Sequence, residues 1–370
     1  MFKRLSAIAM SALLAVGVVT PVLAAESTIK NKDLVVEKAY EEIKQQIIDD
    51  YSELYDLDNF DYDYELKEND GKEYAAIDVY VDMTLTRHPS DSPFVKGMEA
   101  ELAKTRSVEN DEQLQEVIDF YINEVETLYY NIPDRSTFTY AIELKNTDNN
   151  IIETKSNEEV SYDLFYRTDT DDEMLLEDAD RLAPVENEQE AFKSGQEVIQ
   201  KISSENSSFM TRPTTRASWT YDRLDARDWA RDNAYSTPEF PSQTVSGTDC
   251  ANFVSKALNA GGIPEDSSGD WYRASTWGGW PGDNWLRTGY YSNGGVVTYM
   301  EDEGYFYEQS DESKVCAGSI MFWNNTSHVA LVTYGDTVTI KYTQHGAIQS
   351  KDTVYRTEDA SFYMPYASIQ

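Results

Sequence analysis

The chain has 370 residues and a formal net charge of −36 at pH 7, from 31 Lys and Arg against 67 Asp and Glu. A field of this sign repels nucleic acid and anionic membrane surfaces, so neither is an expected partner. Aromatic residues make up 12% of the chain, too many for a disordered acidic protein, so the chain is expected to fold. Two cysteines are too few for a disulfide scaffold.

The first 24 residues have the pattern of an export signal. Lys3 and Arg4 precede an apolar run over 7–22, and VLA at 22–24 supplies small residues at a cleavage point. The run is shorter than the roughly 18 apolar residues of a confident membrane span, and an uncleaved anchor is the alternative. The pattern predicts a secreted protein, extracellular or associated with the cell wall, with no membrane span after cleavage.

Helical and strand patterns alternate over residues 25–204. Apolar residues at helical spacing predict helices over 33–55, 94–131 (broken near 107–109) and 187–204. Period-two alternation predicts strands over 77–85, 136–146 and 158–167, and residues 62–81 have a strand–turn–strand pattern. The order predicts an N-terminal α+β domain with a mostly antiparallel sheet. No motif here points to a metal site, a phosphate loop or a nucleophile, so the role of this domain stays open.

A change in composition marks a domain boundary. Residues 205–218, ENSSFMTRPTTRAS, are rich in Ser, Thr and Pro and lack periodicity. That composition is typical of an exposed linker. We therefore expect residues 219–370 to form a second domain with its own core, able to fold when expressed alone.

The segment TDCANFVSKAL, residues 248–258, places Cys250 in the first turn of a predicted helix. Turn and N-cap residues precede the thiol, and GGIP at 261–264 ends the helix. The amides and dipole at a helix N-terminus stabilise a thiolate and can lower a thiol pKa from about 8.5 to about 3.5–7.5. Cys250 is therefore the candidate nucleophile. A disulfide with Cys316 is the alternative.

A thiolate nucleophile needs a base, and two histidines lie at the ends of predicted strands. His328 begins HVALVTY and His345 ends TVTIKYTQH, with Gly335 and Asp336 as the hairpin turn between them. The two histidines are about equally distant from that turn. One imidazole can then accept the thiol proton while the other orients it. For each histidine, a purely structural role is the alternative.

Four of the seven tryptophans lie within 15 residues, in a segment that also contains several glycines. They are Trp271, Trp277, Trp280 and Trp285. Such a loop either walls a substrate cleft or covers the core, and the sequence leaves both readings open. Trp277 and Trp280 are the candidate substrate contacts. Asn252 is a third candidate, which either supports the site or caps the nucleophile helix.

These segments, together with YDRLDARDWARDNAY at 221–235 and AGSIMFW at 317–323, resemble the putative amidase domain of exported Gram-positive proteins. That family is a branch of the papain-like, NlpC-type peptidases and amidases. The resemblance covers residues 219–370 and implies a nucleophile helix packed on an antiparallel sheet. It implies Cys250 as nucleophile, His328 as general base and His345 as the third, orienting residue.

The resemblance also implies a reaction. The protein would be a cysteine amidase or peptidase that cleaves peptide-type amides, such as those of cell-wall peptides, through an acyl-thioester intermediate. The family implies no metal and no organic cofactor. The alternative is an exported binding or assembly protein whose domain is inactive, with a Cys250–Cys316 disulfide. The oligomeric state stays open.

Overall fold

The computed structural model describes residues 21–366 with gaps, and it shows an α+β protein with a mixed, mostly antiparallel sheet. The gaps are 106–110, 145–161, 171–173, 183, 206–220, 241–247, 274–279, 290–293, 324–325, 347 and 358. Residues 1–20 of the expected export signal, the expected linker from residue 206 on, and Trp277 lie outside the described residues. Within the described part there are eight α-helices, none long and apolar enough to cross a membrane.

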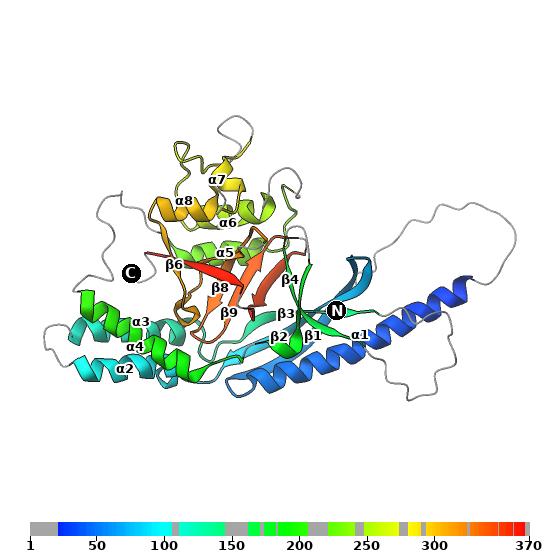
Figure 1. The fold of residues 1–370 in the computed structure, drawn as a ribbon, viewed down its shortest axis with the longest axis horizontal. Coiled ribbons are helices and arrows are strands. Elements are labelled where there is room, and N and C mark those ends of the chain that lie inside the picture. Colours follow the sequence, from blue (N-terminus) through cyan, green and yellow to red (C-terminus); the bar gives the residue numbers. More distant parts are fainter. Residues whose placement is uncertain are drawn as a thin grey trace.

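A single sheet of 11 described strands runs through the molecule (Figure 1), in the order β1-β2-β3-β10-β9-β8-β7-β11-β6, with β4 and β5 branching from β3. The N-terminal strands are β1 (Tyr55–Asn69), β2 (Lys72–Leu85), β3 (Asp134–Glu143), β4 (Leu164–Asp169) and β5 (Met174–Asp178). The C-terminal strands are β6 (Phe306–Gln309), β7 (Ile320–Trp323), β8 (His328–Gly335), β9 (Ile340–Gln344), β10 (Ser350–Val354) and β11 (Ala360–Pro365). The β3–β10 pair is parallel and joins the two sets of strands.

The N-terminal elements follow the order expected from the sequence. The helices are α1 (Pro21–Tyr51), α2 (Pro93–Thr105), α3 (Asp111–Leu128) and α4 (Glu188–Glu205). The predicted strand–turn–strand segment forms the β1–β2 hairpin, and Asp70 and Gly71 take positive φ in its turn. The first helix ends at Tyr51, before the predicted residue 55, because Tyr55 already pairs with Leu85 in the sheet. The short strand β5 was not predicted.

Two hydrophobic clusters form in the N-terminal half. The apolar face of α1, which includes Ile43 and Ile47, packs on β1, β2 and β3. Ile77 of β2 belongs to the same cluster. A second cluster joins α2, α3 and α4, which lie together at one end of the molecule in Figure 1. The cluster under α1 also contains Tyr334 of β8, so this core extends across the predicted domain boundary.

Four helices cover one face of the C-terminal strands (Figure 1). They are α5 (Arg223–Asn233), α6 (Thr248–Ala260), α7 (Asp283–Leu286) and α8 (Val296–Asp302). The core beneath them contains Cys250 together with Val329 and Leu331 of β8. The alternate residues of the same strand, Ala330 and Val332, belong to a separate cluster on the opposite face.

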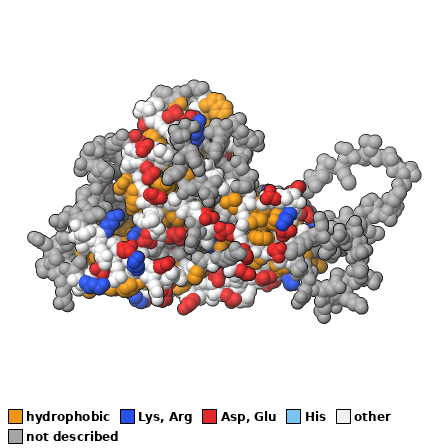
Figure 2. All heavy atoms as spheres, in the orientation of Figure 1, with side chains coloured by type: hydrophobic (Ala, Val, Ile, Leu, Met, Phe, Trp, Pro, Cys, Tyr) orange, Lys and Arg blue, Asp and Glu red, His pale blue; other side chains and the backbone are white. Residues whose placement is uncertain are grey.

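Charged groups also connect the two halves. The Arg231 guanidinium of α5 lies 3.1 Å from Asp134 of β3 and 2.8 Å from Asp352 of β10. The buried Lys341 ammonium of β9 lies 2.9 Å from the same Asp134 carboxylate. The halves therefore share a sheet, part of a core and a network of buried charges. Away from this network, Asp and Glu side chains are spread over the face shown in Figure 2, with fewer Lys and Arg.

Candidate active site

Cys250 lies in the first turn of α6, as predicted, and its side chain is fully buried. Neither Cys250 nor Cys316 forms a disulfide. The Cys316 thiol is buried in the loop before β7, with its Sγ 3.7 Å from the Ser319 hydroxyl. The disulfide required by the inactive-protein alternative is therefore not formed in this structure.

His345 follows the last residue of β9 and packs against the first two turns of α6. Its Nδ1 lies 2.7 Å from Asp249 Oδ2, and its Nε2 lies 3.1 Å from the carbonyl oxygen of Asn233 at the end of α5. The imidazole stacks on the Phe253 ring with centroids 4.3 Å apart. His345 thus ties together α5, α6 and the sheet beside the candidate nucleophile.

Both ring nitrogens of His345 face hydrogen-bond acceptors, an arrangement that a doubly protonated imidazole satisfies. Its partner Asp249 is buried and also accepts hydrogen bonds from the backbone amides of Glu239 and Phe240. Burial favours a raised pKa for Asp249, but the hydrogen bonds from His345 and from the Phe240 amide outweigh it and lower the pKa below its ordinary value. The result is a buried, hydrogen-bonded Asp249–His345 pair directly before Cys250 in the chain.

His328 begins β8, is fully buried, and has a different partner. Its Nε2 lies 2.7 Å from Gln344 Oε1. Gln344 Nε2 donates in turn to the backbone carbonyl of Asp169, at 2.8 Å. A carbonyl only accepts, so this contact assigns the amide nitrogen of Gln344 to Asp169 and the amide oxygen to His328. The hydrogen of the neutral His328 ring then sits on Nε2, and Nδ1 carries the lone pair of a base.

A β-bulge decides which residue meets His328. Near the turn, Tyr334 pairs with Lys341, and beyond the bulge Leu331 pairs with Thr343. The extra residue, Thr333, shifts the register by one, and a shift of one exchanges the two faces of a strand. Without the bulge, His345 would share the face of His328. Because of the bulge, the neighbouring residue Gln344 lies on the same face as His328 instead.

The two imidazoles therefore lie at the same end of β8 and β9, the end at which α6 begins, but on different faces. His328 is paired with Trp323 of β7, their rings 5.3 Å apart, on the face of Ala330. His345 lies on the α6 face. The structure brings His345 against the nucleophile helix and His328 against Gln344, and it does not place one imidazole as the orienting partner of the other.

The tryptophan segment divides between core and surface. Trp271 and Trp285 are fully buried, with ring centroids 4.7 Å apart. Trp280 is 64% exposed and its ring lies 5.9 Å from that of Phe240. Asn252 is buried, and its Oδ1 accepts a hydrogen bond of 2.9 Å from Trp285 Nε1. Asn252 therefore connects α6 to the tryptophan core.

Sequence reasoning missed two residues of this site, Asp249 and Gln344. Asp249 looked like a turn and N-cap residue, although an acidic residue directly before a candidate nucleophile is a signal for a buried partner. Gln344 gave no signal beyond being adjacent to His345, because the bulge that selects it is a feature of backbone pairing.

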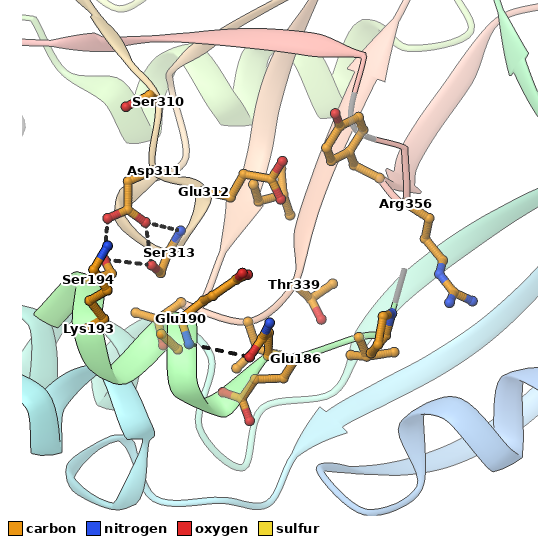
Figure 3. A pocket seen from close by; sticks show the side chains of 18 of the residues that line it. Glu186, Glu190, Lys193, Ser194, Ser310, Asp311, Glu312, Ser313, Thr339 and Arg356 are labelled. Carbon is orange, nitrogen blue, oxygen red and sulfur yellow. Dashed lines mark hydrogen bonds between the residues drawn. The ribbon is translucent and has the colours of Figure 1, made fainter. Parts of the chain in front are cut away.

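A cavity of about 790 Å³ lies elsewhere, between α4 and the C-terminal strands (Figure 3). Its lining includes Glu186, Glu190, Asp311 and Arg356, and none of Cys250, His328 or His345. Asp311 is bonded to the Ser194 and Ser313 hydroxyls (Figure 3). The candidate active site is therefore separate from this cavity.

Comparisons with curated proteins and with solved structures returned no match. A family model described as "Putative amidase domain" matches residues 220–364. The matched segment includes α5, α6 and the strands that carry both imidazoles. This match over residues 220–364 indicates, at a general level, a hydrolase that acts on amides.

Proposed function

We propose that the protein is a cysteine-dependent amide hydrolase in which Cys250 is the nucleophile and His328 the general base. The observation that carries this proposal is the hydrogen-bonded chain from His328 through Gln344 to the Asp169 carbonyl. It supports a base because it holds the ring with the lone pair on Nδ1. His328 begins β8 at the end of the sheet where α6 begins, on the strand face opposite the one that Val329 and Leu331 turn to α6. Catalysis therefore requires the His328 and Cys250 side chains to approach each other at that end.

His345 takes a different part in this proposal from the one that the family resemblance implies. The third, orienting residue is Gln344, since its amide oxygen holds His328 Nε2. His345 positions α6 through Asp249 and Phe253. These contacts hold the first turn of the helix, where backbone amides already favour a thiolate at Cys250.

The reaction follows from these positions. His328 Nδ1 accepts the thiol proton, and the Cys250 sulfur attacks the amide carbonyl. Backbone amides at the start of α6 stabilise the oxyanion. The imidazolium returns its proton to the departing nitrogen, which leaves as an amine, and an acyl-thioester remains on Cys250. His328 then deprotonates a water molecule, which attacks the thioester to release the acid and restore the thiol.

A nucleophile helix packed on antiparallel strands that carry the base is the arrangement of papain-like enzymes, and we assign this domain to that class. Cys250 and His328 are fully buried, so a substrate amide reaches them only when neighbouring groups move. The N-terminal residues have the composition of an export signal, and on that ground we place the activity outside the cell. Cell-wall peptides are the proposed substrates because they carry peptide-type amides in that location.

The test is hydrolysis of defined cell-wall stem peptides and muramoyl-peptides by the full chain, with new amines and carboxylic acids identified by mass spectrometry. Cys250→Ala should abolish product formation. Cys316→Ala is the matched control, because it removes the other buried thiol, and it should retain the activity. Equal activity in the two variants would disprove the cysteine mechanism.

A further inference from the structure

The Gln344 amide is held from the N-terminal half of the chain. Asp169, whose carbonyl accepts its hydrogen bond, is the last residue of β4 and lies 175 positions earlier in the sequence. If the amide rotated by half a turn, its oxygen would face the Asp169 carbonyl and its NH₂ group would face the N–H of His328. Both contacts would be repulsive, so the Asp169 carbonyl selects the tautomer of His328.

A buried arginine fixes Asp169. Arg167 is 1% exposed, and its Nε lies 2.9 Å from Asp169 Oδ2. Its two other nitrogens bind the carbonyl of Tyr140 on β3 and the Asp78 carboxylate on β2. The guanidinium fork therefore ties the end of β4 to two neighbouring strands. A planar fork of this kind fixes direction as well as distance.

The loops after β4 and β9 are also in close contact. A Cβ atom at Gly346 would lie 3.1 Å from the carbonyl oxygen of Thr170 and 3.5 Å from Cε1 of His328. Gly346 thus lies between the Thr170 carbonyl and the His328 ring. This contact is independent of the hydrogen bond and places the N-terminal half within one residue of the candidate base.

We propose that the N-terminal half completes the active site, with Arg167 and Asp169 as positioning residues that act through Gln344 on the tautomer of His328. The expected effect on the rate rests on the proposed function, whereas the expected effect on the tautomer of the His328 ring does not. In this account the N-terminal half has a part in the chemistry, beyond any part in location or substrate access.

The test uses the full chain and reads the tautomer directly by ¹⁵N NMR of histidine side chains. The chain has only three histidines, so single substitutions assign each signal. The wild-type His328 ring should carry its hydrogen on Nε2. Arg167→Gln should give a mixture of tautomers and lower kcat/KM by about 10- to 100-fold, the usual effect of losing a group that orients a functional side chain. Arg87→Gln, which breaks another arginine–carboxylate ion pair, with Glu186, in the same half, is the control and should change neither value.

Gln344→Met keeps the proposal falsifiable if Arg167→Gln fails to fold. This variant removes both hydrogen bonds of the amide and should also release the tautomer. A wild-type tautomer in Gln344→Met, or a wild-type tautomer and rate in a folded Arg167→Gln, would overturn the inference. If the tautomer responds as expected but the wild-type chain hydrolyses no amide, the positioning stands and the proposed function fails.

Discussion

Gln344 Oε1 lies 2.7 Å from His328 Nε2, while the next residue, His345, directs its Nδ1 to Asp249 at the same distance. Two successive residues thus point to opposite faces of the sheet, as strand geometry requires. One orients the candidate base and the other holds the helix of the candidate nucleophile. The roles of the two imidazoles can therefore be separated by substitution.

His328→Ala should reduce kcat/KM to near background because it removes the base, and it should also lower the melting temperature because a fully buried ring is lost. His345→Ala should retain more activity but lose stability, since it removes a hydrogen-bond partner of the buried Asp249 carboxylate. Leaving such a buried acceptor unsatisfied typically costs about 1–3 kcal/mol. Kinetics and thermal unfolding on the same samples separate the effects. Full loss of activity in His345→Ala at unchanged stability would mean that the base has been misassigned.

The Asp249 pair should make stability depend on pH. The pKa of Asp249 is lowered in the folded protein from an ordinary value of 3.8. A lowered pKa contributes stability above the unfolded-state value, and this contribution is lost as the pH falls through the folded-state value. The difference in unfolding free energy between wild type and Asp249→Asn should therefore shrink as the pH falls below 3.8. Urea unfolding at several acidic pH values measures it. A difference that grows with acid would contradict the lowered pKa of Asp249.

The sequence predicted most of the local structure of this site and little of its connectivity. The helix start at Cys250 and the strand start at His328 follow from cap residues and apolar patterns, which are local signals. The partner of His328 depends on a bulge at Thr333, and a one-residue register shift has no counterpart in apolar alternation. Counting residues outward from the turn therefore pointed to His345, and not to Gln344, as the partner of His328.

The sequence also did not predict that the two halves of the chain share one sheet. A Ser-, Thr- and Pro-rich segment is typical of a boundary, and composition does not show which strands pair across it. The β3–β10 pair links strands more than 200 residues apart, as does the contact of Lys341 with Asp134. Such long-range pairs arise from tertiary packing, which leaves no local pattern.

Residues 219–370 expressed alone should consequently be much less stable than the full chain, in contrast to the expectation from the sequence. The isolated segment would expose the β10 edge and leave Lys341 without its Asp134 partner. Far-UV circular dichroism and urea unfolding of the segment and the full chain test this. Cooperative unfolding of the segment at the full-chain midpoint would show that the shared sheet contributes little.

Trp285 and Trp280 should differ in their contributions to stability and to substrate binding. Trp285→Ala should cost about 3–5 kcal/mol of stability, as for other buried aromatic side chains. Trp280→Ala should change stability by about 0.5 kcal/mol or less, because the ring is exposed. If Trp280 contacts substrate, its loss should raise KM. Unchanged kinetics in a stable Trp280→Ala variant would remove Trp280 from the site.

The most direct test of the central claim is the pH dependence of Cys250 alkylation by iodoacetamide in the folded, full-length Cys316→Ala variant. We predict that the rate is half-maximal well below the value of about 8.5 that an ordinary thiol shows. Adding His328→Ala should move the midpoint toward that value, and unfolding in urea should restore it. A folded protein in which Cys250 titrates at or above the ordinary value, or reacts only after unfolding, would contradict the account.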